Sequence, residues 1–298
     1  MGLLILGACG GGDSGQPDGS MMDATLDVAP DTYEASVDVA VDVPPVPAIW
    51  VATAWTLYRY DPLKHVMSRA TDFQCSGEPM IDLAMNANEE LFGITSESVV
   101  RIDKTTGVCT AIARGALDLP YATSFIPAAS LEGGIETWRG YKYSTYSAID
   151  PDSGALTFVG TLGPMGNNLQ ASGDIVTVPN GKTFLTGMTL NPMTGDVLVE
   201  VDPNTGEVTN IDTATGAPGL LGMAQWAGVL YMFSVDGTVY RGLVKEAGVI
   251  IQPYTVTYDW GDSGAPDASV SDGDAEASTV FLQPSWRGAA VTTRAPGL

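Results

Sequence analysis

The amino-acid sequence predicts an all-β domain, because one short unit of strand, turn and strand recurs along much of the chain. In each copy an apolar strand ends in Asp, a tight turn closes on Gly, and a second strand follows. Asp can hydrogen-bond to the backbone of its own turn, and Gly supplies the positive φ that returns the chain. Three complete turns start at Asp103, Asp150 and Asp202, and degenerate copies start at Asp61, which lacks the Gly, and at Lys245, which lacks the Asp.

The spacing of these turns predicts how the units assemble. They are 42 to 52 residues apart, which is the size of a four-stranded blade. Two further apolar runs precede each turn, as at 80–85 and 90–95 in the second unit. The first unit has one run too few, and the run 286–293 at the other end of the sequence can supply it. We therefore expect a five-bladed β-propeller closed by the C-terminal strand, with almost no helix.

A known kind of repeat supports this architecture. Leu-Phe-Gly-Ile-Thr at 91–95 and Arg-Ile-Asp-Lys-Thr-Thr-Gly at 101–107 resemble the repeats of bacterial secreted propellers, whose strands read Leu-Tyr-x-Ile-Asp-Pro-x-Thr-Gly. The likeness covers residues 48–258 and 285–295. It implies the fold and leaves the function open, because such blades serve enzymes, receptors and scaffolds alike.

The first residues carry a second resemblance. Residues 1–9 form an apolar run ending in Leu-Gly-Ala-Cys, similar to the lipobox of bacterial lipoproteins, which implies lipid attachment at Cys9. The positive start and longer apolar stretch of a secretory signal are missing, so we interpret residues 1–9 as a truncated lipoprotein signal. The alternative is a chance cysteine after an apolar segment. Lipid attachment would place the protein in the bacterial cell envelope, at the outer membrane.

Residues 10–47 are rich in Gly, Asp, Ala, Val and Pro, and carry no Lys or Arg. Low apolar bulk and charge of one sign predict a disordered acidic linker, similar in composition to the tethers of myxobacterial lipoproteins. The domain plan is therefore a signal at 1–9, a linker at 10–47 and a propeller at 48–298. A flexible acidic loop is expected at 259–284, since its Asp spacing lacks the pattern of a calcium-binding EF-hand.

Two cysteines remain, Cys75 and Cys109. Because an exported chain meets oxidising conditions, we expect one disulfide between them, with two buried thiols as the alternative. Cys75 follows the outer strand of the first blade and Cys109 lies on that of the second, so a bridge would join neighbouring blades.

Charge excludes one class of partner. The formal net charge is -22, but fourteen of the 35 acids fall at 13–42 and 259–276, and the remaining acids only moderately outnumber the 13 bases. Binding of nucleic acid needs clustered Lys and Arg, and no such cluster occurs. We expect a monomer whose only membrane contact is its N-terminal lipid.

Residues for catalysis are scarce. His65 is the single histidine, whereas a Ser or Cys nucleophile needs a positioned base and a zinc site needs several His or Cys ligands. We therefore predict no enzymatic activity, no metal and no cofactor. Hydrolysis by a carboxylate pair is the remaining alternative, because Asp82 and Asp174 fall on inner strands, where they would face the channel.

The candidate ligand-binding residues fall into two groups. Asp82, Asn86 and Gln225 are expected to line the channel. Trp138, Tyr141 and Tyr143 lie with Tyr146 in a stretch that is unusually polar for core, which makes them the favoured candidates for an exposed aromatic patch, although strand packing is the more common explanation for such residues. The function predicted from all this is a lipid-anchored envelope binding or scaffold protein that holds a peptide, glycan or protein on a propeller face. The alternative is a glycoside hydrolase acting on polysaccharide.

Overall fold

The computed structural model describes six stretches of the chain, which all fall in the unit formed by residues 45–298: 48–115, 118–190, 196–217, 219–246, 248–259 and 284–295. The predictions for Cys9, for the linker and for most of the acidic loop lie outside these residues. No helix of the described stretches is long and apolar enough to cross a membrane.

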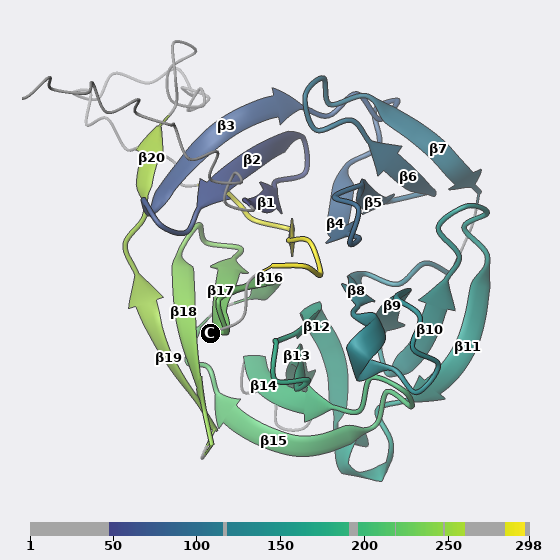
Figure 1. The fold of residues 1–298 in the computed structure, drawn as a ribbon, viewed down its shortest axis with the longest axis vertical. Coiled ribbons are helices and arrows are strands. Elements are labelled where there is room, and N and C mark those ends of the chain that lie inside the picture. The colour runs from purple at the N-terminus through teal and green to yellow at the C-terminus, as the bar shows by residue number, and fades with distance from the viewer. Residues whose placement is uncertain are drawn as a thin grey trace, which may run out of the picture. The chain divides into compact units, whose positions relative to one another are not determined.

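The described strands form five sheets arranged as the blades of a ring (Figure 1). Blade 2 holds β4 (Met80–Met85), β5 (Leu91–Thr95), β6 (Ser98–Ile102) and β7 (Cys109–Arg114). Blade 3 holds β8 (Ala122–Ile126), β9 (Thr137–Lys142), β10 (Thr145–Ile149) and β11 (Leu156–Thr161). Blade 4 holds β12 (Leu169–Thr177), β13 (Thr183–Thr189), β14 (Asp196–Val201) and β15 (Val208–Ala214). Blade 5 holds β16 (Leu220–Trp226), β17 (Val229–Ser234), β18 (Val239–Lys245) and β19 (Gly248–Tyr254).

In blades 2 to 5 each strand pairs antiparallel with the next along the chain, from the axis outward. Two short 3-10 turns, η1 (Ala128–Ser130) and η2 (Pro164–Gly166), are the only helical elements in the described part. The predicted all-β, five-bladed propeller is confirmed.

Blade 1 joins the two ends of the described domain. β1 (Ile49–Ala52), β2 (Thr56–Asp61) and β3 (Val66–Asp72) come from its start, and β21 (Gly288–Ala290) from its end. β21 pairs antiparallel with β1, with Ala289 opposite Val51, so the predicted closure by the C-terminal strand is confirmed.

The closing strand is shorter than the predicted 286–293, because the residues on either side of it serve neighbouring blades. Trp286 is fully buried, and its indole N–H donates to the carbonyl of Gly237 in blade 5 at 3.1 Å. Thr292 turns away from β1 and donates to the carbonyl of Asn86 in blade 2 at 3.1 Å.

A second closing strand was missed by the sequence analysis. β20 (Thr257–Asp259) runs parallel to β3 on the outer edge of blade 1, with Thr257 opposite Val66. Blade 1 therefore has five strands, in the order β20-β3-β2-β1-β21. The ring is closed both at the axis and at the rim.

The recurring turns form as the sequence predicts. The side chain of each Asp accepts the backbone N–H of the residue two positions later, and in most copies also that of the residue three positions later. Asp103, for example, accepts from Thr105 at 2.8 Å and from Thr106 at 3.0 Å. The fourth residue after the Asp has positive φ at Gly107, Gly154 and Gly206. His65 occupies this position in the degenerate first turn and takes the same left-handed conformation, with φ of 61°.

The hydrophobic core lies between the blades and not within any one of them. Five buried clusters occupy the five junctions: Phe92, Phe125 and Trp138, for example, meet between blades 2 and 3. Successive side chains of a strand point to opposite faces, so a blade packed on both sides needs apolar residues at consecutive positions. All five residues of β5 are buried for this reason.

The predicted disulfide is present between Cys75 and Cys109, whose Cα atoms are 4.8 Å apart. It links the segment that leaves blade 1 to the outer strand of blade 2. The bridge lies in the cluster between these blades, together with Met80 and Ile102.

Candidate functional site

The two inner-strand carboxyls expected in the channel lie at the axis, but they are fully buried. On β4, Asp82 accepts the N–H of Leu83 at 2.8 Å through Oδ1 and the N–H of Thr123 at 2.5 Å through Oδ2. Thr123 belongs to β8, so this carboxyl joins blade 2 to blade 3. Burial raises the pKa of Asp82 well above its usual range.

Asp174 on β12 makes the corresponding connections on the other side of the axis. Its Oδ1 accepts the N–H of Ile175 at 2.8 Å, and its Oδ2 accepts the N–H of Met223 at 3.0 Å and of Ala289 at 3.4 Å. The carboxyl thus contacts blade 5 and the closing strand. Burial raises the pKa of Asp174, and the charge of Asp82 raises it further.

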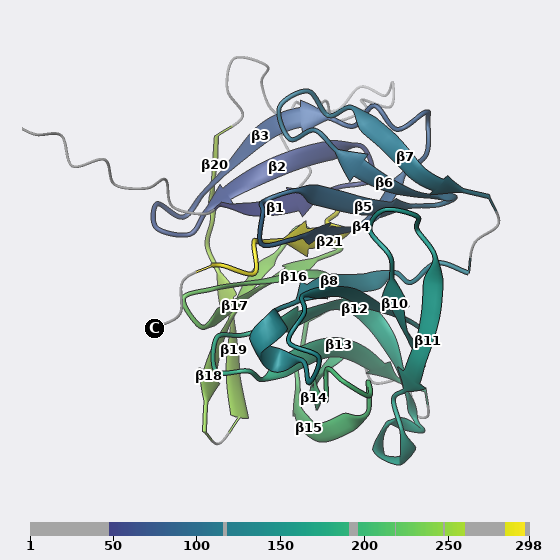
Figure 2. The ribbon, with the colours of Figure 1, turned by 45° about the vertical axis from the view of Figure 1, so that its right-hand side comes forward.

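These contacts correct the prediction that Asp82 and Asp174 project into an open channel. The axis is occupied by β21, which lies beside β1 and against the inner strands β4, β12 and β16 (Figure 2). The cavity left beside it, lined by Thr177, Gln225 and Thr292 among others, measures about 10 Å³, which is room for about one water molecule. A sugar ring therefore cannot reach either carboxyl in this conformation.

The amides predicted to line the channel lie at the ends of inner strands. Asn86 organises the turn after β4, because its Oδ1 accepts from the N–H groups of Asn88 at 2.9 Å and Glu90 at 3.0 Å. Its Nδ2 donates to the Glu90 carboxylate at 2.7 Å. Gln225 lines the small axial cavity and is almost completely buried. Of the three predicted channel residues, only Gln225 borders a cavity.

The predicted exposed aromatic patch is wrong for three of its four residues. Trp138, Tyr141 and Tyr146 are fully buried. Trp138 stacks on Phe125 towards blade 2, with ring centroids 5.5 Å apart, and Tyr141 stacks on Tyr146 towards blade 4 at 4.5 Å. The alternation of side chains along β9 distributes these rings between two junctions.

The hydroxyls of the two buried tyrosines make contacts between blades 3 and 4. The Tyr141 hydroxyl donates to the carbonyl of Gly206 at 2.6 Å, and the Tyr146 hydroxyl to that of Pro203 at 3.1 Å. Burial raises the pKa of both phenols. The indole N–H of Trp138, in contrast, has no acceptor among the described residues.

Tyr143 is the predicted aromatic residue that does reach the surface. It is 57% exposed and lies in the turn between β9 and β10 with a positive φ of 55°. A bulky residue in this left-handed conformation is strained by about 1–3 kcal/mol. Its N–H donates to the Tyr121 hydroxyl at 2.9 Å, and the two rings meet edge to face at 5.7 Å. The strain is held in place by these contacts with Tyr121.

Tyr143 is one of several apolar side chains on the same face of the ring. The turns from the second to the third strand of each blade, and the connections between blades, define what we call the upper face. Four of these five turns carry an exposed large hydrophobic side chain, and η2 adds another: Trp55 (52%), Tyr143, Leu190, Val235 and Met165. The opposite, lower face exposes three in the described residues, Leu63, Val108 and Ile135.

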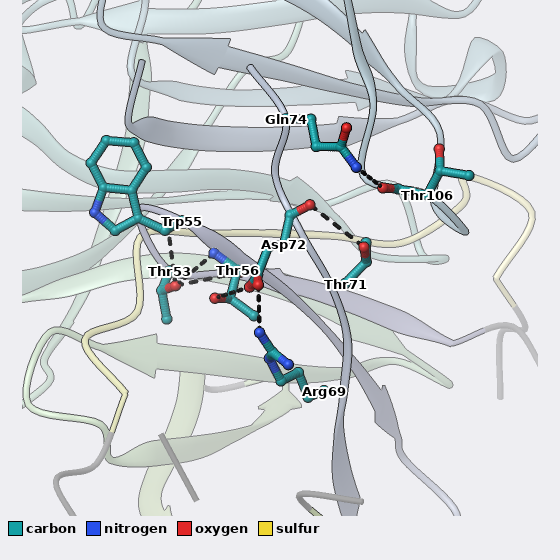
Figure 3. Close-up of polar contacts among 8 residues, drawn as sticks. All are labelled: Thr53, Trp55, Thr56, Arg69, Thr71, Asp72, Gln74 and Thr106. Atoms are coloured by element: carbon teal, nitrogen blue, oxygen red, sulfur yellow. Dashed lines mark hydrogen bonds and ion pairs between the residues drawn. The ribbon is translucent and has the colours of Figure 1, made fainter. Parts of the chain in front are cut away.

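Trp55 is held on a fixed turn (Figure 3). The Thr53 hydroxyl accepts the N–H of Thr56 at 3.0 Å. The Thr56 hydroxyl donates to Asp72 at 2.9 Å, and Arg69 holds the other oxygen of Asp72 at 2.5 Å. The indole ring extends away from this polar network in the figure.

Sequence reasoning missed Trp55, Leu190 and Val235. The signal that could have found them is a large apolar residue inside a short turn, where most chains place Gly, Asn, Asp or Ser. No group of three or more His, Cys, Asp or Glu side chains in the described part is arranged to hold a metal ion.

The described residues define a five-bladed β-propeller with a filled axis and apolar side chains on its upper face. No protein-family model and no curated protein matches the sequence. Among solved structures the chain is similar to BamB from Moraxella catarrhalis, with 11% identity, a TM-score of 0.35 and coverage of 66% of this chain and 55% of BamB. It is also similar to the β-propeller domain of Cps50 (Swd1) from Myceliophteria thermophila, with 12% identity, a TM-score of 0.40 and coverage of 68% and 67%. The match thus spans about half of the BamB chain.

Proposed function

We propose that this protein is a binding or scaffold protein without enzymatic activity, and that it holds a protein partner on its upper face. The observation that carries the proposal is the placement of exposed apolar side chains at the turns of four different blades. Scattered single apolar residues are normal on a surface, but five of them gathered at neighbouring turns of one face are typical of an interaction surface. Rigid aromatic side chains such as Trp55 and Tyr143 are the commonest anchors of such surfaces.

The available apolar area suits a protein partner. Each fully exposed aromatic side chain offers about 150–250 Å², so the two half-exposed rings and three aliphatic side chains together offer roughly 400 Å². A standard interface buries about 800 Å² per partner, of which about 56% is apolar. The two areas agree, whereas a single sugar or small molecule would contact only one of these separated turns.

The two axial carboxyls, Asp82 and Asp174, have no room for a substrate, so we propose no catalytic role for them. Both are fully buried, and all of their oxygens accept backbone N–H groups. A carboxylate pair that hydrolyses a glycoside must flank the scissile bond, with space for the sugar and a water molecule.

Lipid attachment at Cys9 in the bacterial cell envelope is also part of the proposal, supported by the resemblance of residues 1–9 to a lipobox. Palmitate labelling of cells producing the full chain tests it. Labelling of the wild type that is lost on Cys9→Ser supports attachment at this cysteine, and labelling that persists in the variant refutes it.

A photo-crosslinking amino acid tests the binding face. We would place it at position 55 or 143 on the upper face, or at Leu63 on the lower face, which is similarly exposed. In cells, the proposal expects an adduct of one defined mass from both upper positions and none from position 63. Adducts that form equally at all three positions, or at none, would contradict it.

A further inference from the structure

The outer rim of the ring shows one junction that differs from the others. At three junctions the chain leaving one blade makes a backbone hydrogen bond to the start of the next outer strand, and at a fourth a side chain of the outer strand makes the bond instead. Between blades 1 and 2, Gln74 donates to the carbonyl of Gly107 at 2.8 Å. Between blades 3 and 4, Val208 donates to the carbonyl of Leu162 at 3.0 Å. Between blades 4 and 5, Val249 donates to the Asp212 carboxylate at 3.1 Å.

The junction between blades 5 and 1 extends this contact into a strand. Thr257 donates to the carbonyl of His65 at 3.0 Å, and β20 then runs parallel to the first half of β3. The outer edge of a blade in this fold therefore accepts an added extended segment at its start.

At the junction between blades 2 and 3 the described residues make neither kind of hydrogen bond, although Arg101 of β6 forms an ion pair with Asp152 of the blade 3 turn at 3.7 Å. The turn of blade 3 contacts the preceding outer strand by packing, since a Cβ on Gly154 would lie 2.5 Å from that of Ala113. No described strand pairs with the outer edge of β11. On β3, the strand β20 covers the first half of the outer edge. The corresponding half of the outer edge of β11 carries no strand of the described residues.

A cleft opens beside this edge. It measures about 230 Å³ and is lined by Thr157 of β11, by the Asp150-Pro151 turn and by Glu136, over Phe125, Trp138 and Ile149. The volume is below the 300–1,000 Å³ of typical small-molecule sites and suits one side chain of a longer ligand. The Trp138 indole N–H, which has no acceptor among the described residues, is buried at this cleft.

β11 also lacks the features that protect exposed strand edges. Charged residues and Pro commonly block the addition of a further strand. β7 carries Arg114, β15 carries Asp212 and β19 carries Pro253, whereas β11 reads Leu-Thr-Phe-Val-Gly-Thr. Phe158 of β11 is 66% exposed, more than any other large hydrophobic side chain of the described outer strands.

We propose that an extended peptide segment of a partner binds at the junction between blades 2 and 3, adding to the outer edge of β11 as β20 adds to β3. Backbone hydrogen bonds to the strand edge would provide affinity, one apolar side chain would enter the cleft, and a second would pack on the exposed Phe158. The site is separate from the upper face, so it does not depend on the function proposed for that face.

The surrounding charges indicate the ends of the peptide. Asp152 lies in the turn before β11; its side chain is 90% exposed and forms a long surface ion pair with Arg101 at 3.7 Å, which screens its charge little. Glu207 lies beyond the other end, where its Cγ is 3.0 Å from a Cβ built on Gly163. Acidic side chains at both ends favour a peptide with an uncharged, β-prone centre and basic ends. A second copy of this chain is a poorer occupant, because two six-residue edges bury less than the roughly 1,200 Å² of a stable interface.

A synthetic peptide tests the proposal with the full chain. The probe is acetyl-Lys-Lys-Thr-Val-Thr-Tyr-Thr-Lys-Lys-amide, whose centre repeats the sequence of residues 255–258. Fluorescence anisotropy should show saturable binding, and amide hydrogen exchange of residues 156–159 should slow when the peptide is added. Phe158→Ser should weaken binding about tenfold, a change that corresponds to about 1.4 kcal/mol.

Matched controls decide the outcome. Ile211→Ser removes a similarly placed rim side chain on β15, where the junction is closed, and should leave binding unchanged. A probe with Pro in place of its Val should not bind, because Pro cannot donate to the strand edge. The proposal is overturned if the wild type shows no saturable binding, if the Pro probe binds equally, or if both substitutions weaken binding equally.

Discussion

Gly288 offers a sharp test of how the ring is closed. A Cβ built on this residue of β21 would lie 2.4 Å from Oδ1 of Asp82, 2.7 Å from the Asp82 Cα and 2.7 Å from the backbone nitrogen of Leu83. Two of these three atoms belong to the backbone of β4 and cannot rotate away. Gly288→Ala therefore forces the closing strand and the innermost strand of blade 2 apart.

The expected cost follows from the geometry. Overpacking in a filled core costs about 1–3 kcal/mol, and contacts with rigid backbone place Gly288→Ala at the upper end, about 3 kcal/mol. For a domain of this size that corresponds to a fall in Tm of about 6–12 °C. Amide hydrogen exchange of β1, which pairs with β21 through Val51 and Ala289, should accelerate in the variant.

Gly133→Ala provides the matched control, because a Cβ at this glycine meets nothing within 4 Å and its φ is not in the positive range. It should leave stability unchanged or raise it by up to about 1 kcal/mol, since Ala restricts the unfolded chain. A Gly288→Ala protein that melts within a degree of the wild type would show that β21 does not pack against β4 as described.

Three further predictions concern stability. Replacing Cys75 and Cys109 by Ser should lower the free energy of unfolding by about 3–4 kcal/mol, the chain-entropy value for a loop of this size. Urea unfolding of the oxidised wild type and of the double variant measures this difference, and equal midpoints would argue against the bridge. Because the pKa of Asp174 is raised in the folded protein, its carboxyl keeps a proton at pH values where the unfolded carboxyl has lost it, and unfolding releases that proton. The stability of the wild type should therefore fall relative to Asp174→Asn as pH rises above about 4, by up to about 1.4 kcal/mol per pH unit. Urea unfolding of both proteins at pH 4.5 and 6.5 measures that difference, and parallel pH profiles would contradict it. Tyr143→Asn should raise stability by about 0.5–1 kcal/mol, because Asn tolerates the left-handed conformation, and thermal melting of the variant and the wild type measures it. A loss of stability would show that the contact with Tyr121 outweighs the strain.

The fold was predictable because its signals are local. A turn such as Asp103 to Gly107 satisfies its own hydrogen bonds, so its sequence pattern does not depend on what surrounds it. The spacing of five such turns then gave the number of blades, and the strand missing from the first blade indicated the closing strand. Cys75 and Cys109 could be paired because they are the two cysteines left after Cys9 in a chain expected to meet oxidising conditions, and their places on neighbouring blades agreed with a bridge.

The candidate site was harder to predict because burial depends on contacts distant in the sequence. Asp82 and Asp174 were correctly placed on inner strands, but their oxygens are occupied by N–H groups of Thr123 and Met223, which lie 41 and 49 residues away. Trp138 and Tyr141 looked exposed because polar residues surround them. Their neighbours in space are other blades, which a period-two pattern cannot show.

The amino-acid sequence alone therefore determined most of the strands, the turns, the five-fold repeat and which segment closes the ring at the axis, since each depends on residues close together or on a regular spacing. Only the tertiary structure decided which polar groups are buried and that β21 fills the axis. It also decided that β20 covers the outer edge of β3, whereas no strand of the described residues covers that of β11. These depend on how blades meet, and a blade's neighbour is fixed by packing across the ring, not by the order of residues within it.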